Sequence, residues 1–276
     1  MITNILLIRS LIVFLLSMIS ITLFPQEKIR NNDFQPEEGQ EGKNVPWIST
    51  PQVLVEKMLN LAKITPKDFL IDLGSGDGRT VITAAKRGTR ALGIEYNPDL
   101  VKLSKKNAEK EGVAKMAQFI EADLFEFDFS KATVITMFLL PEINMRLRPK
   151  LLGLKPGTRI VSNTFTLQEW QFDEVAKAGN ESNRWNTAYL WIVPAKVEGK
   201  WVNPQGGELI FMQEFQMLTG SMIVGRKKLT ITEGRLHGNE ITFTASGDIY
   251  NGLVVGNKIE GTFTSGGNTK KWSATR

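Results

Sequence analysis

Between about residues 45 and 195, apolar runs of strand length alternate with stretches whose apolar residues recur at helical spacing. The first helical stretch begins at Thr50-Pro51, which offers an N-cap and a first-turn proline. Further helices are expected through Val81 and Ala85 to Gly88, from Asn97 to about Gly112 and from Glu142 to about Leu151. The strand-length runs are 69–73, 90–95, 117–121, 133–138 and 158–163, followed by a closing strand pair at 172–178 and 188–193. This alternation predicts an α/β, Rossmann-like, doubly wound sheet that is mostly parallel, with helices on both faces.

No convincing helical period remains after Pro194, and strand-like runs recur between Gly or Asn turns. These runs are 208–218, 221–224, 228–231, 240–245, 253–255 and 258–263. Residues 233–244 and 250–264 are roughly similar, each half being a strand, a Gly-Asn turn and another strand. Residues 196–276 are therefore predicted to form a small all-β meander, as a sandwich or half-barrel. Its expected core aromatics are Trp201, Phe211, Phe215, Phe243, Phe263 and Trp272. A docking module for a substrate or partner is the functional alternative for this domain.

The N-terminus carries an uncharged apolar run at residues 11–24, preceded by Arg9. Its length suits the core of a signal peptide, and counted from Ile5 it approaches the length of a membrane anchor. We expect residues 1–24 to be one of these two, which makes the protein either membrane-anchored or exported to the periplasm. The polar residues 25–44 are interpreted as a linker.

Composition excludes several kinds of chemistry. The chain has no cysteine and one histidine, so thiolate metal sites, a Cys nucleophile and a Ser-His-Asp triad are not expected. His237 lies in a turn-like context and is interpreted as a surface residue. The net charge is +5, with basic and acidic residues interleaved and no block of like charges, so no nucleic-acid partner is expected.

The strongest chemical signal is the turn Asp72-Leu-Gly74-Ser75-Gly76-Asp-Gly78, at the carboxyl end of the first core strand. Ligands of open parallel sheets bind beyond these strand ends, and glycines let the backbone approach them closely. Glu95 ends the second strand, where a carboxylate can accept hydrogen bonds from both hydroxyls of a ribose. Gly78 lies only two residues after Gly76, which disfavours the pyrophosphate turn of dinucleotide-binding proteins.

With these residues the chain resembles the seven-strand, class I S-adenosylmethionine-dependent methyltransferases over about 150 residues. The resemblance implies an antiparallel last strand, S-adenosylmethionine as cofactor and a methyltransferase domain at residues 45–195. It assigns the turn (Asp72, Gly74, Ser75, Gly76 and Gly78) to the methionine side of the cofactor. It assigns Glu95 to the ribose and Asp123, in Glu121-Ala-Asp-Leu124, to the adenine. It also gives Phe138, Leu139 and Pro141 a substrate-facing position.

The segment Val45-Pro-Trp47-Ile-Ser-Thr-Pro51, together with the cofactor turn, looks like the membrane-anchored lysine methyltransferases of mitochondria and their bacterial relatives. Trp47 stands where that group commonly has a tyrosine. The resemblance implies a protein-lysine acceptor, and an apolar entrance built from Trp47, Phe138 and Leu139 would favour the neutral amine. A small-molecule methyltransferase and a non-catalytic cofactor-binding protein remain alternatives.

Overall fold

The computed structural model describes residues 34–39, 46–179, 185–204 and 206–276. The apolar segment 1–24 and most of the expected linker lie outside these residues. Across the part of the chain that the structure describes, no helix combines the length and the apolar character needed to cross a membrane.

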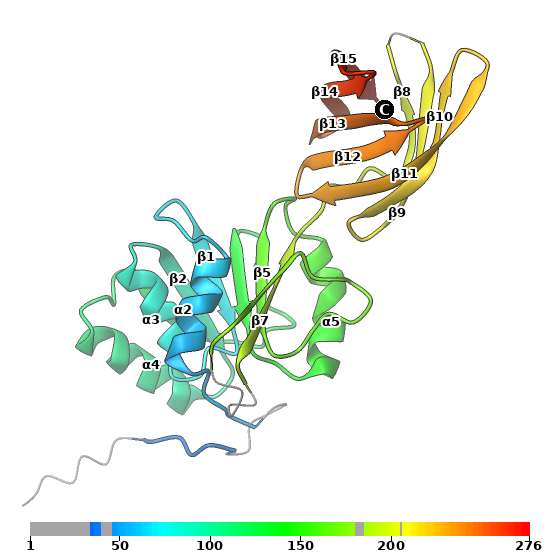
Figure 1. Cartoon of the computed structure of the whole chain (residues 1–276). Coiled ribbons are helices and arrows are strands. Elements are labelled where there is room, and N and C mark those ends of the chain that lie inside the picture. Colours follow the sequence, from blue (N-terminus) through cyan, green and yellow to red (C-terminus); the bar gives the residue numbers. More distant parts are fainter. Residues whose placement is uncertain (1–33, 40–45, 180–184, 205) are drawn as a thin grey trace, which may run out of the picture. The chain divides into compact units, whose positions relative to one another are not determined.

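A seven-stranded sheet with the order β3-β2-β1-β4-β5-β7-β6 is formed within residues 69–192 (Figure 1). Its strands are β1 (Phe69–Leu73), β2 (Arg90–Glu95), β3 (Ala117–Glu121), β4 (Val134–Met137), β5 (Arg159–Asn163), β6 (Glu174–Lys177) and β7 (Thr187–Ile192). The first five are mutually parallel, whereas β7 runs antiparallel to both β5 and β6. The predicted doubly wound, mostly parallel sheet is therefore confirmed.

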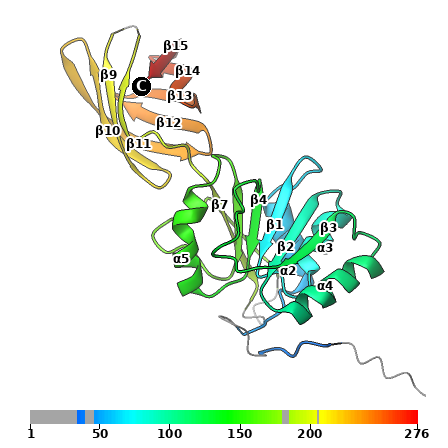
Figure 2. The ribbon, with the colours of Figure 1, turned by 180° about the vertical axis from the view of Figure 1, so that it is seen from behind.

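Helices cover both faces of this sheet and define two separate cores. The helices are α2 (Gln52–Leu61), α3 (Arg79–Lys86), α4 (Pro98–Lys110) and α5 (Pro141–Leu152). Apolar side chains of α2, α3 and α4 pack in one core, and those of α5 pack in the other. Figure 2 shows these elements from behind. Because consecutive strand residues point to opposite faces, Leu70 belongs to the first core and Ile71 to the second.

Two expected helix starts have different outcomes. Asn97 caps α4 as predicted, because its Oδ1 accepts hydrogen bonds from the backbone N–H groups of Asp99 and Leu100. At α2 the prediction is wrong: Pro51 is the N-cap residue, and no side chain caps the helix. The Thr50 hydroxyl instead accepts a hydrogen bond from Asn163 Nδ2 (3.3 Å), which connects this segment to the end of β5.

The C-terminal strands form a closed eight-stranded barrel rather than the expected sandwich or half-barrel. They are β8 (Gly199–Val202), β9 (Glu208–Glu214), β10 (Met217–Val224), β11 (Lys227–His237), β12 (Glu240–Ala245), β13 (Asp248–Val255), β14 (Lys258–Ser265) and β15 (Asn268–Thr275). The sequence pattern missed β8 and β15, which close the barrel by pairing with each other. Only Trp272 and Ala274 of β15 are fully buried, so its apolar signal is weak.

Aromatic side chains fill the barrel interior: Trp201, Phe211, Phe243, Tyr250 and Trp272 are all buried. Phe215 was also expected in this core, and that prediction is wrong. It lies in the turn between β9 and β10 at φ 52° and stacks on Trp170 instead, with ring centroids 6.1 Å apart. The predicted single strand 208–218 is broken at this turn.

Candidate functional site

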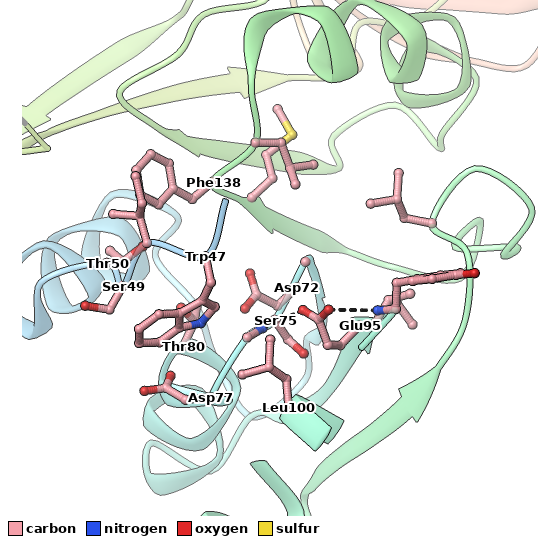
Figure 3. Close-up of a pocket in the computed structure, with 18 of the residues that line it drawn as sticks. Trp47, Ser49, Thr50, Asp72, Ser75, Asp77, Thr80, Glu95, Leu100 and Phe138 are labelled. Carbon is pink, nitrogen blue, oxygen red and sulfur yellow. Dashed lines mark hydrogen bonds between the residues drawn. The ribbon is translucent and has the colours of Figure 1, made fainter. Parts of the chain in front are cut away.

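A cavity lies at the carboxyl ends of the parallel strands and gathers most of the residues that the sequence singled out (Figure 3). The predicted residues that line it are Trp47, Asp72, Gly74, Ser75, Gly76, Glu95, Asp123, Leu124, Phe138 and Leu139. Gly78 and Pro141 are not part of its wall. Gly78 is the N-cap residue of α3, and Pro141 is the first residue of α5.

The turn after β1 is held against the end of β2. The backbone N–H groups of Gly74 and Ser75 both donate to the carbonyl oxygen of Ile94, at 2.9 and 3.0 Å. Gly76 has φ 54°, and a Cβ atom built there would lie 2.8 Å from Trp47 Nε1. Glycine is therefore needed at position 76 both for the left-handed backbone and for the close approach of the indole.

Ser75 lines the cavity, and its side chain also packs against Gly93 of β2. Its Oγ is buried without a hydrogen-bond partner among the described residues. A Cβ atom added to Gly93 of β2 would collide with this oxygen. The small side chains at positions 75 and 93 thus let the turn lie close to the neighbouring strand.

The Glu95 carboxylate is oriented entirely by backbone groups. One oxygen accepts a hydrogen bond from the N–H of Gly76 (2.9 Å). The other accepts from the N–H groups of Tyr96 (2.9 Å) and Asn97 (3.0 Å), as part of Figure 3 shows. This arrangement fixes the acid between the β1 turn and the start of α4.

Asp72 lies deeper in the site. Burial raises the pKa of Asp72 to about 7, and the neighbouring charges of Glu95 and Asp77 act in the same direction. The hydroxyl of Thr136 on β4 donates to its Oδ1 at 2.6 Å, which opposes this shift. Asp72 therefore joins the ends of β1 and β4, and it can change its protonation state near neutral pH.

Arg79 and Asp77 form a pair that sequence reasoning did not single out. Asp77 accepts hydrogen bonds from both Nε and Nη2 of Arg79, which raises the pKa of the guanidinium. Nη1 of Arg79 donates to the carbonyl oxygen of Thr50 at 2.9 Å. The pair thus connects the first turn of α3 to the chain that enters α2.

Residues 46–50, here called the entry segment, form one wall of the cavity. Besides the contact with Arg79, the carbonyl oxygen of Trp47 accepts a hydrogen bond from the N–H of Gly39 (2.8 Å). The backbone N–H of Ser49 donates to a carboxylate oxygen of Glu38 (3.1 Å). The Trp47 side chain lines the cavity (Figure 3).

Besides Trp47, Phe138 and Tyr96, two aromatic residues line the cavity: Phe165 after β5 and Trp185 before β7. Neither belongs to a sequence motif, so only the folded arrangement reveals them. At the opposite end of the wall, the N–H of Phe125 donates to Asp123 Oδ1 at 2.9 Å, which orders the loop after β3.

Comparisons with known proteins agree with this geometry. Residues 72–174 match the family model described as the ANTKMT methyltransferase domain. A protein-lysine N-methyltransferase of Saccharolobus islandicus is 43% identical over 153 residues, covering 54% of this chain and 94% of that protein. The adenine nucleotide translocase lysine N-methyltransferase of Mus musculus is 35% identical over 142 residues, which cover 51% of this chain and 61% of that protein.

Among solved structures, an RNA methyltransferase from Salinibacter ruber in complex with S-adenosyl-L-homocysteine is 45% identical, with a TM-score of 0.51. The match covers 54% of this chain and 96% of that one. The fold, the glycine turn at the carboxyl end of β1 and these relatives agree with one another. The chain therefore belongs to the class I S-adenosylmethionine-dependent methyltransferases, with S-adenosylmethionine as its cofactor.

Proposed function

We propose that this protein methylates a lysine side chain of an acceptor protein. The observation that carries the proposal is the 43% identity to an archaeal protein-lysine N-methyltransferase over nearly all of that protein's length. The mouse relative is also named for a lysine acceptor, although this chain spans only 61% of it.

We further propose that the cavity residues hold the cofactor as the sequence motif suggests. Gly74 and Gly76 present backbone to the cavity because neither residue has a side chain of its own. Glu95 would accept hydrogen bonds from the ribose hydroxyls, and Asp123 with Leu124 would contact the adenine. The carboxylates of the cavity suit a ligand that carries a sulfonium and an ammonium group.

When bound, S-adenosylmethionine supplies an electrophilic methyl group. The amine nitrogen forms the new N–C bond while the S–C bond breaks, and S-adenosylhomocysteine leaves. The protein's tasks are to orient the amine and to exclude water. A lysine has a free pKa of about 10.4, so it must lose a proton to solvent before reacting. The apolar surface of Trp47, Phe138 and Leu139 would favour the neutral amine by desolvation.

An RNA acceptor is the second candidate, because the solved relative at 45% identity is titled an RNA methyltransferase. The charges of the cavity argue against it. Its described lining residues include four acids, Asp72, Asp77, Glu95 and Asp123, against one cation. That cation, Arg79, already binds Asp77 and the Thr50 carbonyl oxygen. A cavity with more acids than cations would repel a phosphodiester and attract an ammonium group.

Cofactor binding can be tested by calorimetric titration of S-adenosylhomocysteine into the full chain. Glu95→Ala should abolish binding or weaken it by at least tenfold. Glu111→Ala is the matched control, because Glu111 is an exposed acid paired with Lys86 and lies outside the cavity. Equal affinity in both variants would contradict the proposed role of Glu95.

The acceptor can be tested by transferring a tritiated methyl group from S-adenosylmethionine into a cell extract. We expect label that protease removes and that acid hydrolysis releases as methyl-lysine. Label that ribonuclease removes would establish the RNA alternative, and label only in small metabolites would establish a small-molecule acceptor. Cofactor binding without any transfer would indicate a non-catalytic protein.

Trp47→Ala and Phe138→Ala should each lower turnover on the protein acceptor, because each removes apolar surface from the entrance. Unchanged turnover would count against the apolar entrance.

We also propose that residues 1–24 direct the protein to a membrane, as an anchor or as a cleaved signal. The uncharged apolar run at residues 11–24 supports this proposal. Fractionation of cells that express the full chain, followed by N-terminal sequencing, separates an anchored protein from a processed one. Recovery of the uncleaved chain in the soluble fraction would contradict both forms.

The domain division is likewise proposed, with a methyltransferase domain at residues 45–195 and a β domain at 196–276. The match to the archaeal relative supports it, because 54% of this chain accounts for 94% of that protein. This leaves no room in the relative for a barrel of this size.

A further inference from the structure

Three aromatic side chains from separate segments meet at the cavity wall. Phe138 follows β4, Phe165 follows β5 and Trp185 precedes β7. The ring centroid of Trp185 lies 5.4 Å from that of Phe138 and 5.9 Å from that of Phe165, and the two Phe rings are 6.2 Å apart. We call these three residues the aromatic trio.

The trio differs from the aromatic side chains of the core. Trp170 and Trp191 are completely buried behind the sheet, whereas each member of the trio is only partly buried and lines the cavity. Large apolar surface left accessible inside a site is a feature of ligand pockets rather than of ordinary packing.

The backbone that carries Phe165 is held in an unusual conformation. Thr164, a β-branched residue, has φ 63°, which such residues rarely adopt. The turn is fixed because the Phe165 carbonyl oxygen accepts a hydrogen bond from Ser162 Oγ (2.6 Å) and the Thr164 N–H donates to Thr187 (2.7 Å). Backbone strain that the surroundings maintain is characteristic of functional sites.

The charges of the cavity that the trio lines favour a cationic ligand over an anionic one. Among the described lining residues four are acids, and the single cation, Arg79, is engaged by Asp77 and the entry segment. Aromatic faces attract alkylammonium groups, and methylated ammonium is favoured because it loses less hydration on leaving water.

We propose that Phe138, Phe165 and Trp185 form a subsite for the methylated ammonium head group of a lysine side chain. The inference rests on the proposed lysine acceptor and extends it. Between transfers, the rings would hold the charged mono- or dimethylammonium group. Once that group has lost its proton, the apolar surface of Trp47, Phe138 and Leu139 would favour the neutral amine for the next transfer. In each round the amine first loses its proton to solvent, an N–C bond forms, the S–C bond breaks and S-adenosylhomocysteine departs.

The test uses the full chain saturated with S-adenosylhomocysteine and two small probes of equal shape. One is the N-acetyl, N-methylamide derivative of trimethyl-lysine, and the other is its neutral analogue in which carbon replaces the quaternary nitrogen. We expect the charged probe to bind at least tenfold more tightly in a calorimetric or NMR titration. Equal affinity for the two probes would overturn the subsite.

Substitutions in the trio test whether these rings cause the preference for the charged probe. Trp185→Leu and Phe165→Leu should each remove most of the preference for the charged probe, whereas Trp185→Phe should retain it. Phe172→Leu is the control, because Phe172 packs on Tyr189 outside the cavity and is 40% exposed. A preference that survives both leucine variants would contradict the assignment.

Binding of S-adenosylhomocysteine to each variant shows that its fold is intact. The same measurement distinguishes a failure of the subsite from a failure of the proposed lysine acceptor. If the wild-type chain binds S-adenosylhomocysteine but does not distinguish the probes, only the subsite fails. If charged-probe selectivity is present but the acceptor assay yields no methyl-lysine, the lysine acceptor fails instead.

Discussion

Carboxyl groups in the cavity differ in chemistry because their immediate partners differ. Asp72 is enclosed by the sheet and receives one hydroxyl, whereas Glu95 receives three backbone N–H groups. Asp77 faces a guanidinium. Residue type alone does not distinguish these acids, so their separate tasks follow from the groups that the fold places around them.

The raised pKa of Asp72 predicts a pH dependence of stability. With a pKa of about 7 in the folded protein and about 3.9 when unfolded, the folded state binds the proton more tightly. The free energy of unfolding should therefore fall as pH rises from about 4 to about 7, by a few kcal/mol from this group, and then level off.

Chemical denaturation of the cofactor-free protein at a series of pH values measures this slope. Asp72→Asn should flatten it across that range, because the amide does not titrate. Asp128→Asn is the control, since Asp128 is fully exposed and the Ser130 N–H lowers its pKa. A slope that is the same in Asp72→Asn and wild type would refute the assignment.

At the scale of elements, the turn between β1 and α3 depends on glycine for two separable reasons. Gly78 has φ 84°, and a Cβ atom there would lie 2.7 Å from the Phe119 ring. Gly112, after α4, also has a left-handed backbone (φ 69°), but a Cβ atom there would meet nothing within 4 Å. The two positions therefore separate backbone strain from steric overlap.

Gly112→Ala should cost about 1–2 kcal/mol of unfolding free energy from backbone strain alone. Gly78→Ala should cost about 1–3 kcal/mol more, because the added methyl group also forces Phe119 and Ser104 apart. Urea denaturation of both variants at one pH provides the comparison. Equal losses would mean that the ring moves aside without cost.

The entry segment is the second element whose position matters. Arg79 holds it through the Thr50 carbonyl oxygen while bound to Asp77. Arg79→Lys keeps the charge but loses the planar fork that reaches both partners. We expect its dissociation constant for S-adenosylhomocysteine to rise by about tenfold, which is about 1.4 kcal/mol.

Arg87→Lys is the matched control for calorimetric titration. Arg87 pairs with Glu56 and Asn60 on α2 and does not line the cavity. Its replacement should leave the affinity for S-adenosylhomocysteine within about twofold of wild type. An equal loss of affinity in both variants would indicate a general effect on α2 and α3 instead of a role for the entry segment.

At the scale of the whole molecule, the apolar cores of the sheet and of the barrel are separate clusters of residues. The two cores that flank the sheet are built from residues 54–193 with a contribution from Phe215, and the barrel core from residues 195–274. Aromatic side chains fill the barrel, which accords with a structural or docking role rather than with a second ligand cavity.

A chain ending at Ala195 should therefore fold and bind S-adenosylhomocysteine with an affinity within about threefold of the full chain. Circular dichroism and calorimetry check this result. If the barrel docks the acceptor, methylation of protein by the shortened chain should fall while cofactor affinity stays unchanged. Loss of cofactor binding together with loss of folding would contradict the division at residue 195.

The sequence by itself determined the local elements and the location of the site. The boundaries of β1, β2 and β3 agree with the apolar runs, because strands bounded by glycine or polar turns carry their signal within a few residues. Asp72, Glu95 and Asp123 were predictable as neighbours, because the carboxyl ends of parallel strands meet at one edge of a sheet.

Only the tertiary structure decided the features that depend on contacts between distant residues. The aromatic trio joins positions 138, 165 and 185, and the raised pKa of Asp72 results from burial of its carboxyl group in the folded protein. Closure of the barrel depends on β8 meeting β15 across the whole domain. Sequence spacing encodes periodicity and turns, whereas burial and long-range pairing depend on how all the elements pack together.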